Sequence, residues 1–286
     1  MLNPKLNLNS KIFDEGVEQQ PIRKGFGEGL LEAGRGNDKV VGLCADLTES
    51  TQMHLFKNEF PKRFIEIGVA EQNLATVASG MAAMGKIPFI TSYAVFSPGR
   101  NWEQIRTTIC YNDRPVKIIG SHSGISVGLD GGTHQATEDI ALMRTLPNMV
   151  VISPCDAIEA RKATIAIAKN KNPTYLRLVR NKTPLITTED TLFEIGKAQV
   201  FYDSSEGEGA QIGIIATGML VYQSIIAARE LEKEGVTVKV LNFTTIKPAD
   251  EKAIIDLAKE TKAIVSVEDH QIAGGLGSLV SEVLSK

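Results

Sequence analysis

Short apolar runs alternate along the chain with longer stretches in which apolar residues recur at helical spacing. The apolar runs predict buried strands at 40–44, 64–67, 87–91, 116–121, 150–153, 211–216, 237–242 and 263–267. The longer stretches predict helices at 70–84, 101–110, 138–144, 157–169, 219–234, 249–259 and 277–284. Strands that alternate with helices indicate an α/β fold, in which parallel sheets are covered on both faces.

The same pattern suggests where the domains begin and end. Residues 1–21 are polar and contain Gly and Pro, so we expect an N-terminal arm without regular structure. The apolar pattern lapses at about 180–195, where threonine and acidic residues dominate. We therefore expect a parallel-sheet domain over residues 22–185 and a smaller α/β domain over 195–286. The polar segment 203–209 predicts a turn or hairpin loop.

Charge and cysteine content exclude several classes of protein. The chain has 286 residues with 31 basic and 34 acidic side chains, a formal net charge of −3. This balance argues against non-specific binding to nucleic acid or to a membrane surface. The three cysteines form no CxxC pair, which argues against a disulfide framework and favours the reducing cytoplasm. No apolar run has the length of a signal peptide or a membrane span.

Several familiar motifs are incomplete. The segment 80–87 approaches a phosphate loop, but Ile87 stands where Ser or Thr would hold magnesium. The glycines of 273–277 follow a predicted strand, but Val280 replaces the third glycine of a dinucleotide fingerprint. We interpret them as a site of tight helix–strand packing. The four histidines form neither an HExxH pair nor Cys/His metal spacing, so we expect no metal site in this chain.

Two further segments place side chains suited to ligand binding at the end of a predicted strand. One carries a carboxylate, and the other carries two aromatic rings. Glu71 lies in the first turn of a helix among small and apolar neighbours. A carboxylate there is partly desolvated and can bind one proton or one ring nitrogen. The alternative is that it only stabilises the helix start. Tyr93 and Phe96 stand three residues apart, and a core stripe is the alternative to a ligand contact.

A third segment, residues 121–135, is rich in glycine and carries His122, Asp130 and His134. Glycines let a backbone approach a ligand closely. Two histidines and an aspartate can serve acid–base chemistry or anion binding. The alternative is a plain surface loop.

With these segments the chain resembles the C-terminal half of transketolase, from about Ile22 to its end. GVAEQN, SYAVF and VGLDGGTHQATEDIALMR occur in that order, followed by AQIGIIATG and SVEDHQIAGGLG. The resemblance implies a thiamine-diphosphate pyrimidine-binding domain followed by the transketolase C-terminal domain. Family members usually continue for a further strand and helix, so we expect the second domain to be either truncated at Lys286 or incompletely ordered at its end.

The resemblance also implies a partner. In full-length transketolases a diphosphate-binding domain with a GDG…N segment comes first, and this sequence has no such segment. The chain therefore resembles the C-terminal subunit of a split transketolase. An N-terminal transketolase subunit would hold the diphosphate and Mg²⁺ (or Ca²⁺), and neither subunit would work alone. We expect a heterotetramer that contains a homodimer of this chain. Small residues would allow close helix approach across that interface, namely Ala70, Ala75, Ala78, Ser79 and Ala82.

Roles at the cofactor are implied residue by residue. Glu71 matches the acid that hydrogen-bonds the aminopyrimidine ring and favours its imino tautomer, which then removes the thiazolium C2 proton. Tyr93 and Phe96 match two aromatics that pack around the pyrimidine, and Ile90 stands where many members have a third ring. Asp46 matches an acid near the cofactor at the subunit boundary.

The resemblance further implies a site for sugar phosphates. The residues that match the phosphate grip are Arg23, Ser50, His122 and Arg180. Asp130 and His134 match contacts to substrate hydroxyls, where His134 can move a proton onto or off a sugar oxygen. Guanidinium groups suit this role because their charge is permanent and their fork fits a phosphate.

The function implied is transfer of a two-carbon ketol unit between sugar phosphates, as in the pentose phosphate pathway. One alternative is another thiamine-diphosphate enzyme, of the deoxyxylulose-phosphate-synthase or 2-oxoacid dehydrogenase β type. The DGGTHQ segment argues against the dehydrogenase, and the length of the chain argues against the synthase. The other alternative is a non-catalytic regulatory subunit, against which Glu71 and both loop histidines argue.

Overall fold

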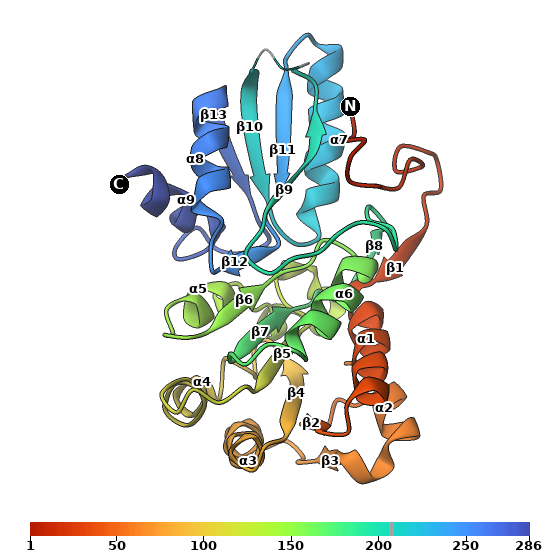
Figure 1. Ribbon diagram of the computed structural model, residues 1–286, viewed down its shortest axis with the longest axis vertical. Helices are drawn as coiled ribbons and strands as arrows, with labels where there is room; N and C mark the ends of the chain where they lie inside the picture. Colours follow the sequence, from red (N-terminus) through yellow and green to blue (C-terminus); the bar gives the residue numbers. More distant parts are fainter. Residues whose placement is uncertain (206, 208) are drawn as a thin grey trace.

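The computed structural model describes residues 1–205, 207 and 209–286 as two stacked α/β units (Figure 1). The lower unit in this view contains a seven-stranded sheet, and the upper unit contains a four-stranded one. The predicted turn at 203–209 includes residues 206 and 208, which lie outside the described residues. The α/β class with mainly parallel sheets is confirmed.

The seven-stranded sheet has the order β12-β6-β7-β5-β4-β2-β3. Its strands are β2 (Val40–Cys44), β3 (Phe64–Glu66), β4 (Ile87–Tyr93), β5 (Lys117–Ser121), β6 (Val150–Ile152), β7 (Thr174–Arg177) and β12 (Thr245–Lys247). Strands β2 to β7 run parallel, and all five strands predicted here are confirmed. The antiparallel edge strand β12 comes from the second part of the chain and was not predicted.

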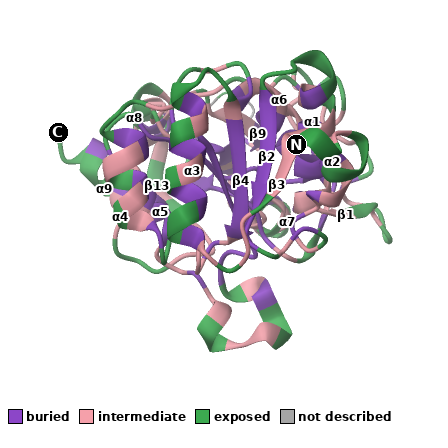
Figure 2. Cartoon of the chain, turned by 90° about the horizontal axis from the view of Figure 1, so that it is seen from below, coloured by how far each residue is buried: buried purple, intermediate pink, exposed green. Residues whose placement is uncertain are grey.

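Helices cover both faces of this sheet. On one face lie α1 (Ile22–Gly36), α2 (His54–Glu59) and α6 (Ala157–Ile167), with the 3-10 turn η1 (Pro61–Arg63) beside α2. On the other lie α3 (Glu71–Ala83), α4 (Trp102–Gln104), the π-helical turn η2 (Ile105–Cys110) and α5 (Asp139–Arg144). Figure 2 shows β2 and β4 buried between these two groups. Helix α1 packs so closely on α6 that a Cβ on Gly25 would lie 1.8 Å from the carbonyl oxygen of Ala157.

The second unit is a four-stranded sheet in the order β13-β10-β11-β9. Its strands are β9 (Gln199–Asp203), β10 (Ala210–Ala216), β11 (Val238–Asn242) and β13 (Thr261–Val267). Its helices are α7 (Leu220–Lys233), α8 (Glu251–Glu260) and α9 (Leu276–Leu284). The three strands and three helices predicted after residue 195 are confirmed, and the antiparallel strand β9 was missed.

The N-terminal residues run along the second unit before they reach the first. Ile12 is fully buried in a cluster with Phe201 and Tyr202. The arm then ends in β1 (Gln19–Pro21), which pairs with β8 (Lys182–Pro184). The start of the chain therefore connects the two units.

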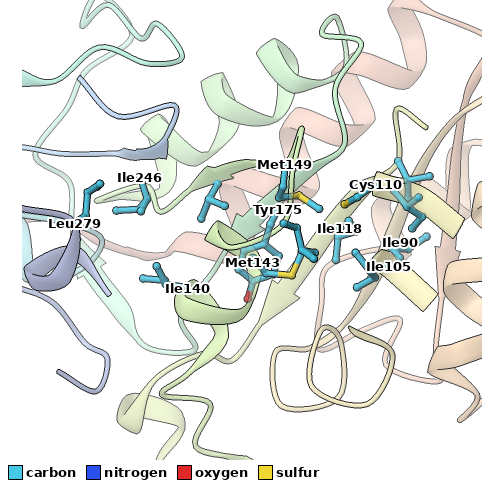
Figure 3. Packing of buried hydrophobic residues seen from close by; sticks show 14 of the residues in the cluster. Ile90, Ile105, Cys110, Ile118, Ile140, Met143, Met149, Tyr175, Ile246 and Leu279 are labelled. Carbon is cyan, nitrogen blue, oxygen red and sulfur yellow. The ribbon is translucent and has the colours of Figure 1, made fainter. Parts of the chain in front are cut away.

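One hydrophobic cluster extends through both units. In Figure 3, Ile90 and Ile118 of the first sheet continue through Met143 to Ile246 and Leu279 of the second part of the chain. Since burial of such side chains is the dominant favourable term in folding, this shared cluster fixes the second unit against the first.

The small residues of α3 face this same cluster. Ala75, Ala78 and Ala82 are buried in it, and the Ser79 hydroxyl donates to the carbonyl of Thr108 at 2.6 Å. Our expectation that they form a contact with a second copy of the chain is therefore wrong. They let α3 pack closely on its own sheet and on η2. The exposed residues of α3 and its C-cap are Gln72, Asn73, Thr76, Gly80, Ala83 and Met84.

The glycines of 273–277 form the tight packing site predicted for them. The Glu268 carboxylate accepts hydrogen bonds from the backbone N–H groups of Leu276 and Gly277 at 2.7 and 2.9 Å. It thus occupies the positive N-terminus of α9, where a dinucleotide phosphate would bind. The three cysteines are free and buried. In the described part of the chain, no helix is long and apolar enough to cross a bilayer.

Candidate active site

The candidate site lies at the carboxyl edge of the seven-stranded sheet. Parallel strands end at a common edge, which is where open α/β sheets bind ligands. Strand β4 ends at Tyr93, β5 leads directly into His122, and β7 ends shortly before Arg180. Two short 3-10 turns in the loop after β5, η3 (Ile125–Asp130) and η4 (Gly132–His134), carry the next residues of interest.

Glu71 is the first residue of α3, and it is only 2% exposed. Its Oε2 accepts a hydrogen bond from Nη1 of Arg100 at 2.8 Å, and the Arg100 side chain is 47% exposed. The Arg100 guanidinium also lies 4.6 Å from the centre of the Phe96 ring. The helix N-terminus stabilises the negative charge. The result is a buried carboxylate beside an aromatic ring, with one partner that reaches solvent.

A buried amide holds the start of this helix in place. Asn101 donates to the backbone carbonyl of Glu71 at 2.9 Å and to the hydroxyl of Ser97 at 3.2 Å. The turn that carries Phe96 and Arg100 is therefore fixed against Glu71. Our sequence analysis identified neither Arg100 nor Asn101.

Four rings from two of the predicted segments form an aromatic cluster: Tyr93, Phe96, His122 and His134. Tyr93 and His122 stack with centroids 3.9 Å apart, and the Tyr93 and Phe96 rings lie nearly parallel, with centroids 6.2 Å apart. His134 meets Phe96 edge-on at 5.4 Å. Tyr93 and Phe96 are both partly exposed, so the core-stripe interpretation does not describe them. The cluster forms an apolar wall at the carboxyl edge of the sheet.

His122 is the buried member of the cluster. Its Nδ1 and the Ser121 hydroxyl share a hydrogen bond of 2.8 Å. Burial, followed by the positive charges of Arg23 and Arg180, lowers the pKa of His122 to about 3. His122 is therefore neutral at neutral pH and can offer a hydrogen bond but no positive charge.

Arg23 and Arg180 lie next to His122, from opposite ends of the first unit. Arg23 donates to the backbone carbonyl of Arg180, and Arg180 donates to the carbonyl of Val127 at 2.8 Å. Burial and the charge of Arg180 lower the pKa of Arg23, and its buried Nε has no partner among the described residues. Neither arginine pairs with a described carboxylate. Two such cations favour an anion between them.

Asp46 is exposed and lies in a turn after β2, with a positive φ of 56°. Its N–H donates to Oε1 of Glu66 at 2.7 Å, and the same oxygen accepts from the N–H of Gly68 at 2.9 Å. Glu66 thus joins the Asp46 turn to the turn that leads into Glu71. We missed Glu66, although it ends a strand as the other site residues do.

Ser50 and Asp130 are less closely connected to the site. Ser50 is half-buried in the turn before α2, and Asp130 is half-buried at the end of η3. Neither side chain forms a hydrogen bond or ion pair with the described site residues. The structure thus brings together Glu71, the aromatic cluster and the two arginines, and it leaves Asp46, Ser50 and Asp130 at the margin.

Comparisons with known proteins match both units of the chain to one family. Residues 18–185 match the family "Transketolase, pyrimidine binding domain", and residues 204–286 match "Transketolase, C-terminal domain". The chain is 38% identical to the 6-deoxy-6-sulfo-D-fructose transketolase subunit SqwH of Clostridium sp., over 96% of this chain and 84% of that protein. It is 36% identical to an apulose-4-phosphate transketolase subunit of Phocaeicola vulgatus, over 92% of this chain and 83% of that protein.

A solved structure described as "Split gene transketolase, inactive beta4 tetramer" has the same fold. It shares 41% identity and a TM-score of 0.85 with this chain, over 94% of this chain and 86% of that one. The resemblance found in the sequence is confirmed, because both domain families match in the expected order. This chain belongs to the transketolase family.

Proposed function

We propose that this chain is the C-terminal subunit of a thiamine-diphosphate-dependent transketolase. Together with an N-terminal partner subunit it transfers a two-carbon ketol unit between sugar phosphates. The observation that carries the proposal is the buried carboxylate of Glu71 beside the Phe96 ring, at the same sheet edge as two arginines that pair with no described carboxylate. Two relatives are named transketolase subunits, one for a phosphorylated and one for a sulfonated sugar, which supports an anionic substrate.

The chemistry of these groups fits the aminopyrimidine half of the cofactor. A nitrogen heterocycle needs apolar walls and a carboxylate that can share a proton with a ring nitrogen. Tyr93 and Phe96 supply walls, and Glu71 supplies the carboxylate. When bound, thiamine diphosphate supplies the carbon nucleophile that takes up the ketol unit. We assign the diphosphate contacts and Mg²⁺ (or Ca²⁺) to the partner subunit, and Asp46 to the boundary with it.

Glu71 has the central role among the residues of this chain. Its carboxyl group holds a proton at the ring nitrogen, and burial keeps water from competing for that hydrogen bond. Arg100 is the group that must share Glu71 with the ring, since it donates to the same carboxylate.

The substrate phosphate is assigned to Arg23, Arg180 and the neutral His122, with Ser50 as a further hydrogen-bond donor. The two guanidinium groups supply charge, and His122 supplies an uncharged hydrogen bond. Asp130 and His134 are assigned to sugar hydroxyls. Nδ1 of His134 shares a hydrogen bond of 2.9 Å with the Thr133 hydroxyl, which leaves Nε2 to move a proton onto or off a substrate oxygen.

Reconstitution tests the proposal. The chain is co-expressed with a partner that carries a thiamine-diphosphate-binding GDG…N segment, and the complex is sized by light scattering. We expect a heterotetramer that transfers a ketol unit from a ketose phosphate to an aldose phosphate, whereas each subunit alone is inactive. A stable complex without this activity, for any tested pair of sugar phosphates, would contradict the assigned reaction.

Calorimetry tests which subunit binds the cofactor. The chain alone is titrated with thiamine diphosphate and Mg²⁺, and we expect little or no binding because the diphosphate contacts belong to the partner. The solved structure described as an inactive β4 tetramer supports the expectation that this chain alone is inactive. Tight magnesium-dependent binding to this chain alone would overturn the two-subunit assignment.

A further inference from the structure

The loop that carries Asp130 and His134 has a narrow neck. The N–H of Gly124 donates to the carbonyl of Ala136 at 2.8 Å, so the two ends of the loop meet. We call residues 124–136 the site loop. Such a loop is closed by few hydrogen bonds, so its opening equilibrium depends on what holds the neck.

A segment of the second unit lies against this neck. Residues 268–271, which follow β13, are here called the clamp segment. Oδ1 of Asp269 accepts from the N–H of Ile125 at 3.1 Å, and the N–H of Gln271 donates to the carbonyl of Thr137 at 2.9 Å. The clamp segment therefore bonds to the chain at both ends of the site loop.

Asp269 lies so close to the neck of the site loop that position 124 requires a glycine. Gly124 has a φ of +75°, and a Cβ there would lie 1.9 Å from Oδ2 of Asp269. This oxygen is buried and has no hydrogen-bond partner among the described residues. A buried polar atom without a partner costs stability, so packing alone does not explain an aspartate at this position.

The backbone of Asp269 is itself fixed to the first sheet. Nη2 of Arg177, on β7, donates to the carbonyl of Asp269 at 2.6 Å, and Nε of Arg177 donates to Oδ2 of Asp139 at 2.9 Å. Asp139 begins α5, directly after the site loop. The side chains of this ion pair are 2% and 0% exposed, which makes it a rigid support.

We propose that Asp269 is a positioning residue, through which the second unit holds the site loop shut and fixes His134 and Asp130 for the reaction. The consequence for the reaction rests on the function proposed above, whereas the consequence for the loop does not. The second unit then has a specific task at the active site, although it contributes no residue to the aromatic cluster.

Hydrogen exchange of the full chain, followed by mass spectrometry, tests the hold on the loop without any assay of activity. The Asp269→Ala variant loses the acceptor for the Ile125 N–H, and Asp269→Asn keeps an acceptor oxygen. We expect peptides from 124–136 to exchange roughly 10- to 100-fold faster in Asp269→Ala and close to the wild-type rate in Asp269→Asn. If Asp269→Ala does not fold, Asp269→Ser takes its place, since its side chain is too short to reach Ile125.

A matched control breaks another contact between the two units. The Glu282→Ala variant removes the ion pair between α9 and Arg144 of α5, away from the neck of the site loop. Its site loop should exchange at the wild-type rate. Unchanged exchange of 124–136 in a folded Asp269→Ala or Asp269→Ser variant would overturn the proposal, as would equal acceleration in the Glu282→Ala variant.

Kinetics of the reconstituted heterotetramer then test the link to the reaction. We expect kcat/KM for ketol transfer to fall roughly tenfold or more in Asp269→Ala and to be restored by Asp269→Asn. Wild-type activity in Asp269→Ala, despite faster loop exchange, would remove the positioning role. If the wild-type complex itself is inactive, the function proposed above fails, and the exchange data still decide whether Asp269 holds the loop.

Discussion

The two units end their parallel strands in the same way, but the polar side chains at the two edges have different partners. In the second unit, Asn242 donates to Glu159 at 2.9 Å, and Glu268 is fully engaged with the start of α9. In the first unit, the half-exposed Arg100 is the one ion-pair partner of Glu71 among the described residues. Within the described part of the chain, Arg23 and Arg180 donate to backbone carbonyls and to no carboxylate.

This difference separates the edge of the second unit, which we call the structural edge, from the edge of the first unit, which we call the reactive edge. A buried charge whose partners come from the same fold stabilises that fold, and it has no capacity left for a ligand. A buried charge with a displaceable partner, or with none, keeps that capacity. Position at the end of a strand is common to both edges, so the partners of the charges identify the site.

The largest expected effect is that of Glu71→Gln in the reconstituted enzyme. Glutamine has nearly the same volume but cannot exchange a proton with a ring nitrogen, so ketol transfer should fall roughly 10²–10⁴-fold or more. The loss should also appear as slow hydrogen–deuterium exchange at C2 of the cofactor, measured by quenched NMR before any sugar is added. Glu59→Gln, at an exposed acid paired with Arg35, serves as the control. Near-normal C2 exchange in folded Glu71→Gln would reduce Glu71 to a helix-start residue.

The next largest effect concerns the unpaired cations. Arg180→Ala should raise KM roughly 10- to 100-fold for phosphorylated sugars, because a charge-assisted hydrogen bond is lost. KM for a sugar without phosphate should change much less. The control is Arg35→Ala, which removes an exposed arginine that already pairs with Glu59. Equal losses for both kinds of sugar would take Arg180 out of the phosphate site.

Much of the fold could be predicted from the sequence because most strands are buried on both faces. Strand β2, with the sequence VVGLC, is buried at every position and therefore reads as a continuous apolar run. Strand β7, with the sequence TYLR, is equally buried but was missed. Its Tyr175 and Arg177 are paired with Asp139, 36 and 38 positions away in the chain, and no local pattern reveals such a pairing.

The residues of the candidate site could be predicted, or were missed, for the same reasons. Glu71, His122 and His134 were found because they lie in distinctive segments at strand ends. Arg100 and Asp269 were missed because their roles come from contacts between segments that are 29 and 144 residues apart. Arg100 follows Phe96 by four residues, which is a weak signal for a cation over a ring.

At the structural edge we expect a loss of stability without a loss of chemistry. Both carboxylate oxygens of Glu159 accept hydrogen bonds, one from the N–H of Cys155 and the other from Asn242 and Thr244. In Glu159→Gln, the NH₂ group of the amide would face one of these sets of donors. The free energy of unfolding should fall by about 1–3 kcal/mol, while kcat stays within about twofold of the wild type. Urea denaturation of the full chain measures the first quantity, with the exposed Glu230→Gln as control. A loss of kcat in excess of the loss of folded protein would contradict the contrast between the two edges.

A further expected effect is a pH dependence of stability that arises at His122 of the reactive edge. Burial and the two neighbouring arginines hold the pKa of His122 at about 3, whereas an unfolded histidine titrates near about 6.5. Between these values the unfolded chain binds a proton that the folded chain does not, so stability must fall as the pH falls. From pH 7 to pH 5 this amounts to about 2 kcal/mol for one histidine.

The His122→Asn variant keeps a polar side chain but has no titrating group at this position. From pH 7 to pH 5 its free energy of unfolding should therefore fall by about 2 kcal/mol less than that of the wild type. Urea denaturation at both pH values measures this difference. Since the arginines contribute to the low pKa, sulfate bound between them, whose charge is constant from pH 5 to pH 7, should weaken the pH dependence of the wild type and leave that of His122→Asn unaltered. Parallel pH profiles for the two proteins, with or without sulfate, would mean that His122 is not held neutral beside these two cations.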